Sequence, residues 1–97
     1  MKNFFNGVLN GLKNSYKNVT QEASDYDDEN NSQLVRYNFK YNKNSYELDV
    51  MYYDEKGVIV MEIMDEDKPG IEKDDFSITT IDKAIEHVLN FVEWNLK

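Results

Sequence analysis

The sequence predicts one α+β domain in which two terminal helices pack on one face of an antiparallel sheet. The chain has 97 residues, a length that suits a single domain over residues 1–97. Apolar residues recur at helical spacing near both ends, and they alternate at every second position between residues 34 and 64. We therefore expect the order α-β-β-β-α, with a three-stranded sheet.

The first helix is predicted over residues 3–17. Its apolar face contains Phe4, Phe5, Val8, Leu9, Leu12 and Tyr16. Gly7 and Gly11 interrupt this pattern, and each costs about 1 kcal/mol relative to Ala inside a helix. Two interpretations stay open: the glycines form a close-approach surface for another backbone, or packing of the helix simply tolerates them.

Residues 20–33, TQEASDYDDENNSQ, contain five acidic residues and no basic one, so we predict an acidic loop or linker there. The alternating pattern then predicts strands over 34–41, 46–53 and 58–64. Residues 42–45 and 54–57 have turn composition and are expected to form two four-residue loops.

The two four-residue loops fix the register of the three predicted strands. Only a register that places apolar residues opposite apolar residues keeps them all on one face of the sheet. On the core face, the expected pairs are Tyr41–Tyr46, Phe39–Leu48, Tyr37–Val50, Tyr52–Ile59, Val50–Met61 and Leu48–Ile63. On the opposite face, they are Lys40–Glu47, Asn38–Asp49, Arg36–Met51, Tyr53–Val58, Met51–Val60 and Asp49–Glu62.

The pair Asp49–Glu62 is destabilising, because like charges lie directly opposite each other. Glu47 adds a third carboxylate, and apolar side chains lie beside this cluster: Met51, Tyr53, Val58, Val60 and Met64. Such a mixed surface is typical of a binding site. The alternative is that Arg36 and Lys40 neutralise the cluster on a merely solvated face.

Residues 65–75, which are rich in acids and contain the only proline of the chain, are predicted to form a loop. The segment FSITT that follows extends the sheet to four strands if Phe76 and Ile78 form an edge strand. The second helix is predicted over 81–96, with Thr79 or Thr80 as its N-cap. Its buried face contains Ile81, Ala84, Ile85, Val88, Leu89 and Val92.

The composition excludes several chemistries. The chain has no cysteine, so it cannot form a disulfide framework, a zinc ribbon or a cysteine nucleophile. Its acidic segments fail the EF-hand spacing, because positions 12 counted from Asp25 and Asp65 are Arg36 and Phe76. The one histidine, His87, is interpreted as a half-buried, hydrogen-bonded structural residue. We expect no enzymatic activity, no cofactor and no metal.

Asn6, Gly7, Asn10 and Gly11 interrupt the N-terminal apolar residues, so we expect neither a signal peptide nor a membrane span there. This predicts a cytoplasmic protein without a membrane partner. The net charge of −8 opposes direct nucleic-acid binding. Residues 21–33 carry −5 and residues 54–75 carry −6, and if they lie near each other their field would attract a basic protein.

Basic grooves are typical of nucleic-acid-binding proteins, so such a protein is the expected partner. A short, acidic, cysteine-free chain with the loops DYDDEN and DEDKPGIEKDD around a small sheet resembles small phage-encoded inhibitors, anti-CRISPR proteins of the DNA-mimic type. The resemblance concerns organisation and includes no residue motif. It implies a non-enzymatic inhibitor that blocks DNA recognition by a CRISPR nuclease.

The predicted partner-binding residues combine acids of the sheet and the loop with the apolar face: Glu47, Asp49, Glu62, Asp65, Glu66, Asp67, Asp74, Asp75, Met51, Tyr53 and Val60. The alternative is an immunity or adaptor module, or a homodimer, that uses the apolar outer face of the sheet.

Overall fold

The computed structural model describes residues 1–96. In chain order, a helix precedes five strands and a second helix follows them. The elements are α1 (Lys2–Ser15), β1 (Lys17–Ala23), β2 (Ser32–Tyr41), β3 (Asn44–Tyr53), β4 (Val58–Asp65), β5 (Glu72–Ser77) and α2 (Ile81–Leu96).

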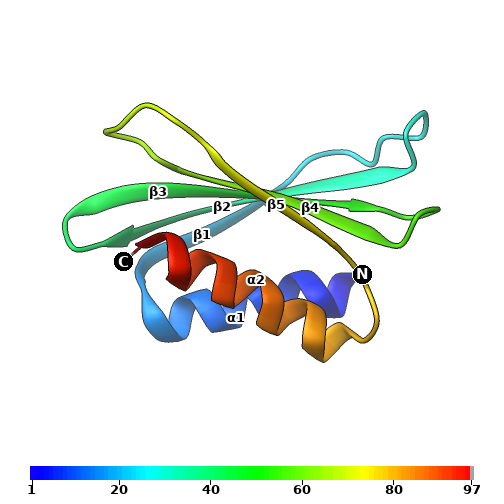
Figure 1. The fold of residues 1–97 in the computed structure, drawn as a ribbon, viewed down its shortest axis with the longest axis horizontal. Coiled ribbons are helices and arrows are strands. Elements are labelled where there is room, and N and C mark those ends of the chain that lie inside the picture. Colours follow the sequence, from blue (N-terminus) through cyan, green and yellow to red (C-terminus); the bar gives the residue numbers. More distant parts are fainter. Residues whose placement is uncertain (97) are drawn as a thin grey trace.

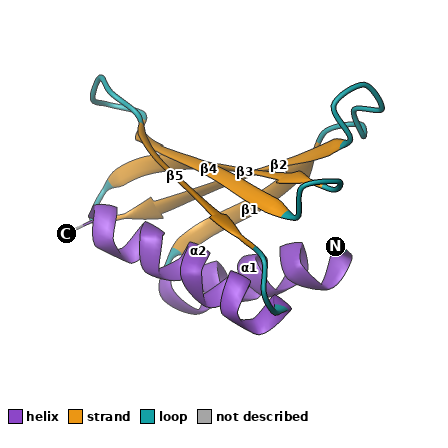
Figure 2. Cartoon of the chain, turned by 45° about the vertical axis from the view of Figure 1, so that its right-hand side comes forward, coloured by secondary structure: helices purple, strands orange, loops and turns teal. Residues whose placement is uncertain are grey.

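All five strands form one antiparallel sheet whose spatial order, β1-β2-β3-β4-β5, is also their order in the chain. Both helices lie side by side on the same side of this sheet (Figure 1). No described element covers the other side, which we call the open face (Figure 2). The α+β class with both helices on one face is therefore confirmed, whereas the expected number of strands was too small.

The core lies between the helices and the sheet, where both amphipathic patterns place their apolar residues. Tyr37 of β2 is fully buried there, and its hydroxyl donates a hydrogen bond to the carbonyl oxygen of Phe5 in α1 at 2.9 Å. The other large, fully buried side chains are Phe4, Val8, Leu12, Phe39, Leu48, Val50, Ile59, Met61, Val88 and Val92.

The two glycines of α1 make room for α2. A Cβ atom built on Gly7 would overlap the side chain of Ile85, and one built on Gly11 would overlap that of Leu89. The glycines therefore form a close-approach surface, as one of the two interpretations held. It receives side chains of the neighbouring helix rather than its backbone.

Gly11→Ala is expected to lower the free energy of unfolding by about 1 kcal/mol, because overpacking against Leu89 exceeds the gain of helix propensity. Urea unfolding would measure this change. Asn10→Ala is the matched control on the exposed side of α1, and it should stabilise the protein slightly. An equal gain for Gly11→Ala would show that the two helices are not closely packed there.

The second hairpin has the predicted register, with Tyr52 opposite Ile59 and Asp49 opposite Glu62. The first hairpin was predicted wrongly by two residues. Asn42 and Lys43 alone form its turn with φ values of 49° and 71°, a left-handed pair that suits a two-residue hairpin turn. Asn44 and Ser45 therefore belong to β3, so Arg36 lies opposite Asp49 rather than Met51.

Both edge strands differ from the prediction. The segment 20–33 is not all loop, because β1 includes its first four residues. Likewise, β5 begins at Glu72 within the segment predicted as loop, and it includes only the first two residues of FSITT. Each strand has a single partly buried residue, Val19 in β1 and Phe76 in β5. An exposed edge strand pairs through its backbone and needs no apolar alternation.

The helix predictions agree closely with the structure. The helix expected over 3–17 ends two residues earlier, where Tyr16 adopts an extended conformation. The helix expected over 81–96 has these bounds. Of its two candidate caps, Thr80 accepts a hydrogen bond from the backbone amide of Lys83 through Oγ1 at 3.2 Å.

Candidate interaction surface

Charged side chains cross the middle of the open face in a single row. Each is the register partner of the next on five successive strands, and we call them the ionic row: Glu22, Arg36, Asp49, Glu62 and Lys73. The two adjacent carboxylates at its centre are the pair that the sequence predicted to repel. The row also supplies the basic residues that neutralise them.

Arg36 neutralises most of the predicted carboxylate cluster. Its Nε donates to Oδ1 of Asp49 at 2.9 Å and lies 3.4 Å from Oε2 of Glu47. Lys73 pairs with the remaining carboxylate, with 3.1 Å between its Nζ and Oε1 of Glu62. Lys40, the other predicted counter-ion, lies opposite Ser45 instead. The shorter first turn explains this exchange, since it brings Arg36 directly across from Asp49.

Glu47 is the carboxylate of this cluster whose protonation the fold favours. Burial raises its pKa, and the neighbouring Asp49 raises it further, while Arg36 opposes both effects. A raised pKa means that Glu47 destabilises the fold progressively as the pH rises from its unfolded pKa, about 4.3, through its folded value.

Glu47→Gln is therefore expected to stabilise the protein by a few tenths of a kcal/mol at pH 7, an effect limited by the loss of the contact with Arg36. The difference from wild type should disappear below about pH 4, where Glu47 is protonated in both states. Thermal unfolding between pH 3.5 and 7.5 would measure it. A gain that is constant across this range would contradict the role of the carboxyl.

Beside the ionic row, toward the loop between β1 and β2, the open face becomes apolar. Two successive rows of side chains form what we call the apolar patch: Leu34, Met51 and Val60, then Tyr53 and Val58. All five are partly exposed. The predicted residues Met51, Tyr53 and Val60 thus form one surface, whereas Met64 lies beyond the ionic row opposite Glu47.

Acidic side chains gather next to the apolar patch, where the chain passes from β1 to β2 and from β3 to β4. We call this group the acidic end: Asp25, Asp27, Asp28, Glu29, Asp54 and Glu55. These two connections, residues 24–31 and 54–57, contain one basic residue, Lys56. The backbone joins them, since the amide of Asp54 donates to the carbonyl oxygen of Asn31 at 2.8 Å.

Hydrogen bonds hold the acidic end in a defined conformation. The hydroxyl of Tyr26 donates to Oδ2 of Asp54 at 2.7 Å, and this bond raises the pKa of Tyr26 to about 12. The carboxylate of Asp27 accepts hydrogen bonds from the backbone amides of Glu29 and Asn30 and from the Asn30 side chain. The bonds from Asn30 lower the pKa of Asp27, so this carboxylate is held ionised.

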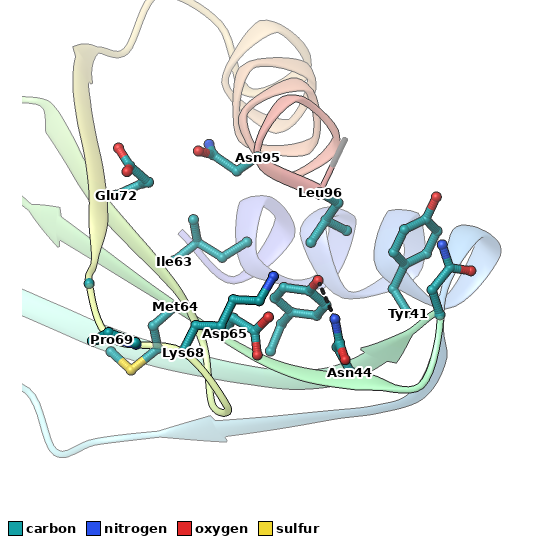
Figure 3. Close-up of a pocket in the computed structure, with 13 residues that line it drawn as sticks. Tyr41, Asn44, Ile63, Met64, Asp65, Lys68, Pro69, Glu72, Asn95 and Leu96 are labelled. Atoms are coloured by element: carbon teal, nitrogen blue, oxygen red, sulfur yellow. Dashed lines mark hydrogen bonds between the residues drawn. The ribbon is translucent and has the colours of Figure 1, made fainter.

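The predicted loop acids Asp65, Glu66 and Asp67 lie at the opposite end of the sheet, where β4 ends. There the backbone amide of Asp67 donates to Oδ1 of Asp65 at 2.9 Å. The loop borders a cavity of about 370 Å³ beneath the end of α2, with Lys68 beside it (Figure 3). The two acidic segments therefore do not merge, and only Asp54 and Glu55 of the second reach the first.

The two predicted acids of β5 lie on opposite faces of the sheet. Asp75 is on the open face, as the register partner of Val60. Asp74 instead faces α2, where its Oδ2 lies 3.0 Å from Nε2 of His87. The ring of His87 stacks on Phe76 with centroids 3.9 Å apart. His87 is thus half-buried and hydrogen-bonded, as the sequence predicted.

Sequence reasoning missed the acidic end as a site and the role of Lys73. The acidic end could be recognised only once the pairing of β1 with β2 was known, and the sequence of β1 has too few apolar residues to predict that strand.

Within residues 1–96, no group of three or more metal-ligating side chains is placed to hold a metal ion. None of the described helices is long and apolar enough to cross a membrane. Comparisons with protein-family models, curated proteins and solved structures give no match.

Proposed function

We propose that this protein is a non-enzymatic inhibitor that binds a basic, nucleic-acid-binding protein, such as a CRISPR nuclease, and occludes its nucleic-acid site. One observation carries the proposal: the apolar patch on the uncovered sheet face directly borders the acidic end. An apolar centre with a charged rim is the usual anatomy of a protein interface. The acidic rim selects basic partners and accelerates their association.

The ionic row contributes less to this recognition than the acidic end does. Asp49 and Glu62 already have basic partners within the chain, so a partner's Lys or Arg would have to compete with Arg36 and Lys73. The acidic end has a single basic residue among six acids, and all six acids are exposed. Its field therefore extends into solvent and is available to a partner.

The test begins with affinity capture from a bacterial lysate at low salt, followed by identification of the protein released at high salt. The purified partner is then titrated into wild type and into Asp28→Lys/Glu29→Lys/Glu55→Lys, a variant that reverses exposed charges of the acidic end. We expect weaker binding and a smaller salt dependence for the variant. Wild type should also displace labelled DNA or RNA from the partner.

The loop at the other end provides the matched control, Asp65→Lys/Glu66→Lys/Asp67→Lys. If the acidic end is the interface, this control loses less affinity than the first variant. If neither charge reversal changes affinity or salt dependence, the electrostatic proposal is wrong.

The apolar patch also supports the second function, an adaptor or immunity module that binds through apolar contacts. Here, Met51→Ser/Val60→Ser should abolish binding of the captured partner while charge reversal at the acidic end changes little. Sedimentation of wild type and of this variant would test the homodimer, since a dimer through the patch should dissociate when its apolar centre becomes polar.

A further inference from the structure

The strand β5 leaves one side of its backbone without a partner. It pairs with β4 alone, and no described residue hydrogen-bonds its outer edge. In an antiparallel strand, every second residue then directs its N–H and C=O groups away from the sheet. The pairing of β5 with β4 is regular from Glu72 to Ser77, so the free groups of this edge form an uninterrupted series that another strand can pair with.

The other edge strand, β1, lacks this regularity. Its register shifts between Lys17 and Thr20, and Asn18 between them has a φ value of 55°. Such a bulge twists an edge away from further pairing. Of the two edges of the sheet, β5 is therefore the one suited to strand addition.

An open cavity of about 580 Å³ lies beside the contact of β5 with α2. Asp74 lines it from β5, and the side chains of α2 that line it include His87, Phe91 and Trp94. The indole of Trp94 is 78% exposed, which is unusual for the largest apolar side chain of the chain. β5 is the outermost strand of the sheet on the side of α2 (Figure 2).

The charge of this surface selects its occupant. Three of the six residues of β5 are acidic, Glu72, Asp74 and Asp75, and one is basic. Pairing of β5 with the same strand of a second copy would place these acids against one another, which is unfavourable. A strand that carries Lys or Arg would gain from the same acids.

We infer that β5 and the cavity beside α2 bind an extended basic peptide of a partner protein as a sixth strand. The peptide backbone pairs with the free edge of β5, and alternate side chains point to opposite faces. On the helix side, an apolar side chain enters the cavity against Trp94 and Phe91, while a basic one reaches Glu86. This surface is separate from the acidic end and does not depend on it.

The test uses a fluorescein-labelled nine-residue peptide that alternates Lys with Val and Phe. Trp94 is the only tryptophan, so its emission reports directly on the cavity. We expect a blue shift as the peptide buries the indole, and binding by anisotropy below about 1 mM. N-methylation of alternate peptide amides keeps the charge but blocks strand pairing, so it should weaken binding about tenfold or more.

Trp94→Ala should weaken binding by a similar factor, whereas Ile81→Ala, an exposed control on the same helix outside the cavity, should not. Amide chemical shifts should move in β5 and along α2. The inference fails if no peptide binds below about 1 mM, or if the N-methylated peptide binds equally well. It also fails if the shifts move at the acidic end instead, a result that would leave the proposed function intact.

Discussion

Tyr37→Ala is expected to lower the free energy of unfolding by about 3–5 kcal/mol, the largest effect of any substitution considered for this protein. Tyr37 is fully buried between β2 and α1, so truncation removes apolar contacts and leaves a cavity. It also removes the hydrogen bond to the carbonyl oxygen of Phe5. Because domains of this size are stable by only about 5–15 kcal/mol, this loss removes a large share of the total stability.

Tyr37→Phe separates the two contributions. It keeps the ring and removes only the hydroxyl, so the expected loss is about 1 kcal/mol. Tyr53→Ala is the matched control, because Tyr53 lies on the open face and is partly exposed. Urea unfolding of the three variants would test this order. A loss for Tyr37→Ala no larger than that for Tyr53→Ala would show that α1 does not pack on β2 as described.

Arg36→Met is expected to lower the free energy of unfolding by about 1–2 kcal/mol at pH 7, after allowance for the partial exposure of the guanidinium. The substitution leaves Glu47 and Asp49 close together on the same strand without their shared cation. The pKa of Glu47 in the folded state, which burial and Asp49 already raise, should then rise further, because Arg36 no longer opposes these effects. The methionine retains most of the apolar contact of the arginine stem.

The pH dependence distinguishes this electrostatic effect from a packing defect. A pKa raised by folding costs stability only as the pH rises through it, so Arg36→Met and wild type should converge below about pH 4. Lys40→Met is the control, because Lys40 is exposed and lies opposite Ser45. A deficit of Arg36→Met that persists unchanged at pH 3.5 would argue against the carboxylate cluster as its cause.

The core could be predicted from the sequence because buried faces require apolar residues at a regular spacing along each strand and helix. Leu48, Met61 and Val88 lie where the alternating and helical patterns placed them. The register of the first hairpin could not, since Asn42-Lys43-Asn44-Ser45 suits either a four-residue or a two-residue connection. Only the paired φ values of Asn42 and Lys43 decide between them. The edge strand β1 escaped prediction, and β5 was predicted only from Phe76 onward, because exposed, polar residues carry no periodic signal.

The apolar patch of the candidate site could be predicted from the sequence, whereas the acidic end and the ion pairs of the ionic row could not. The alternation of side chains along each strand was enough to place Met51 and Val60 on the open face. A register error of two residues does not change the face on which a side chain lies. The cross-strand partner of Asp49 changes with the register, so the sequence paired Arg36 with Met51, whereas the structure pairs it with Asp49. The acidic end depends on the contact of two separate connections through Tyr26 and Asp54, which lie 28 positions apart.

The sequential order of the strands has a consequence for folding kinetics. Each strand pairs with its neighbour in the chain, so the sheet assembles through short loops and at low entropic cost. The contact between α1 and α2 instead joins the two ends of the chain. We expect this contact to form after the transition state, so Gly11→Ala should accelerate unfolding in stopped-flow experiments and leave the refolding rate nearly unchanged.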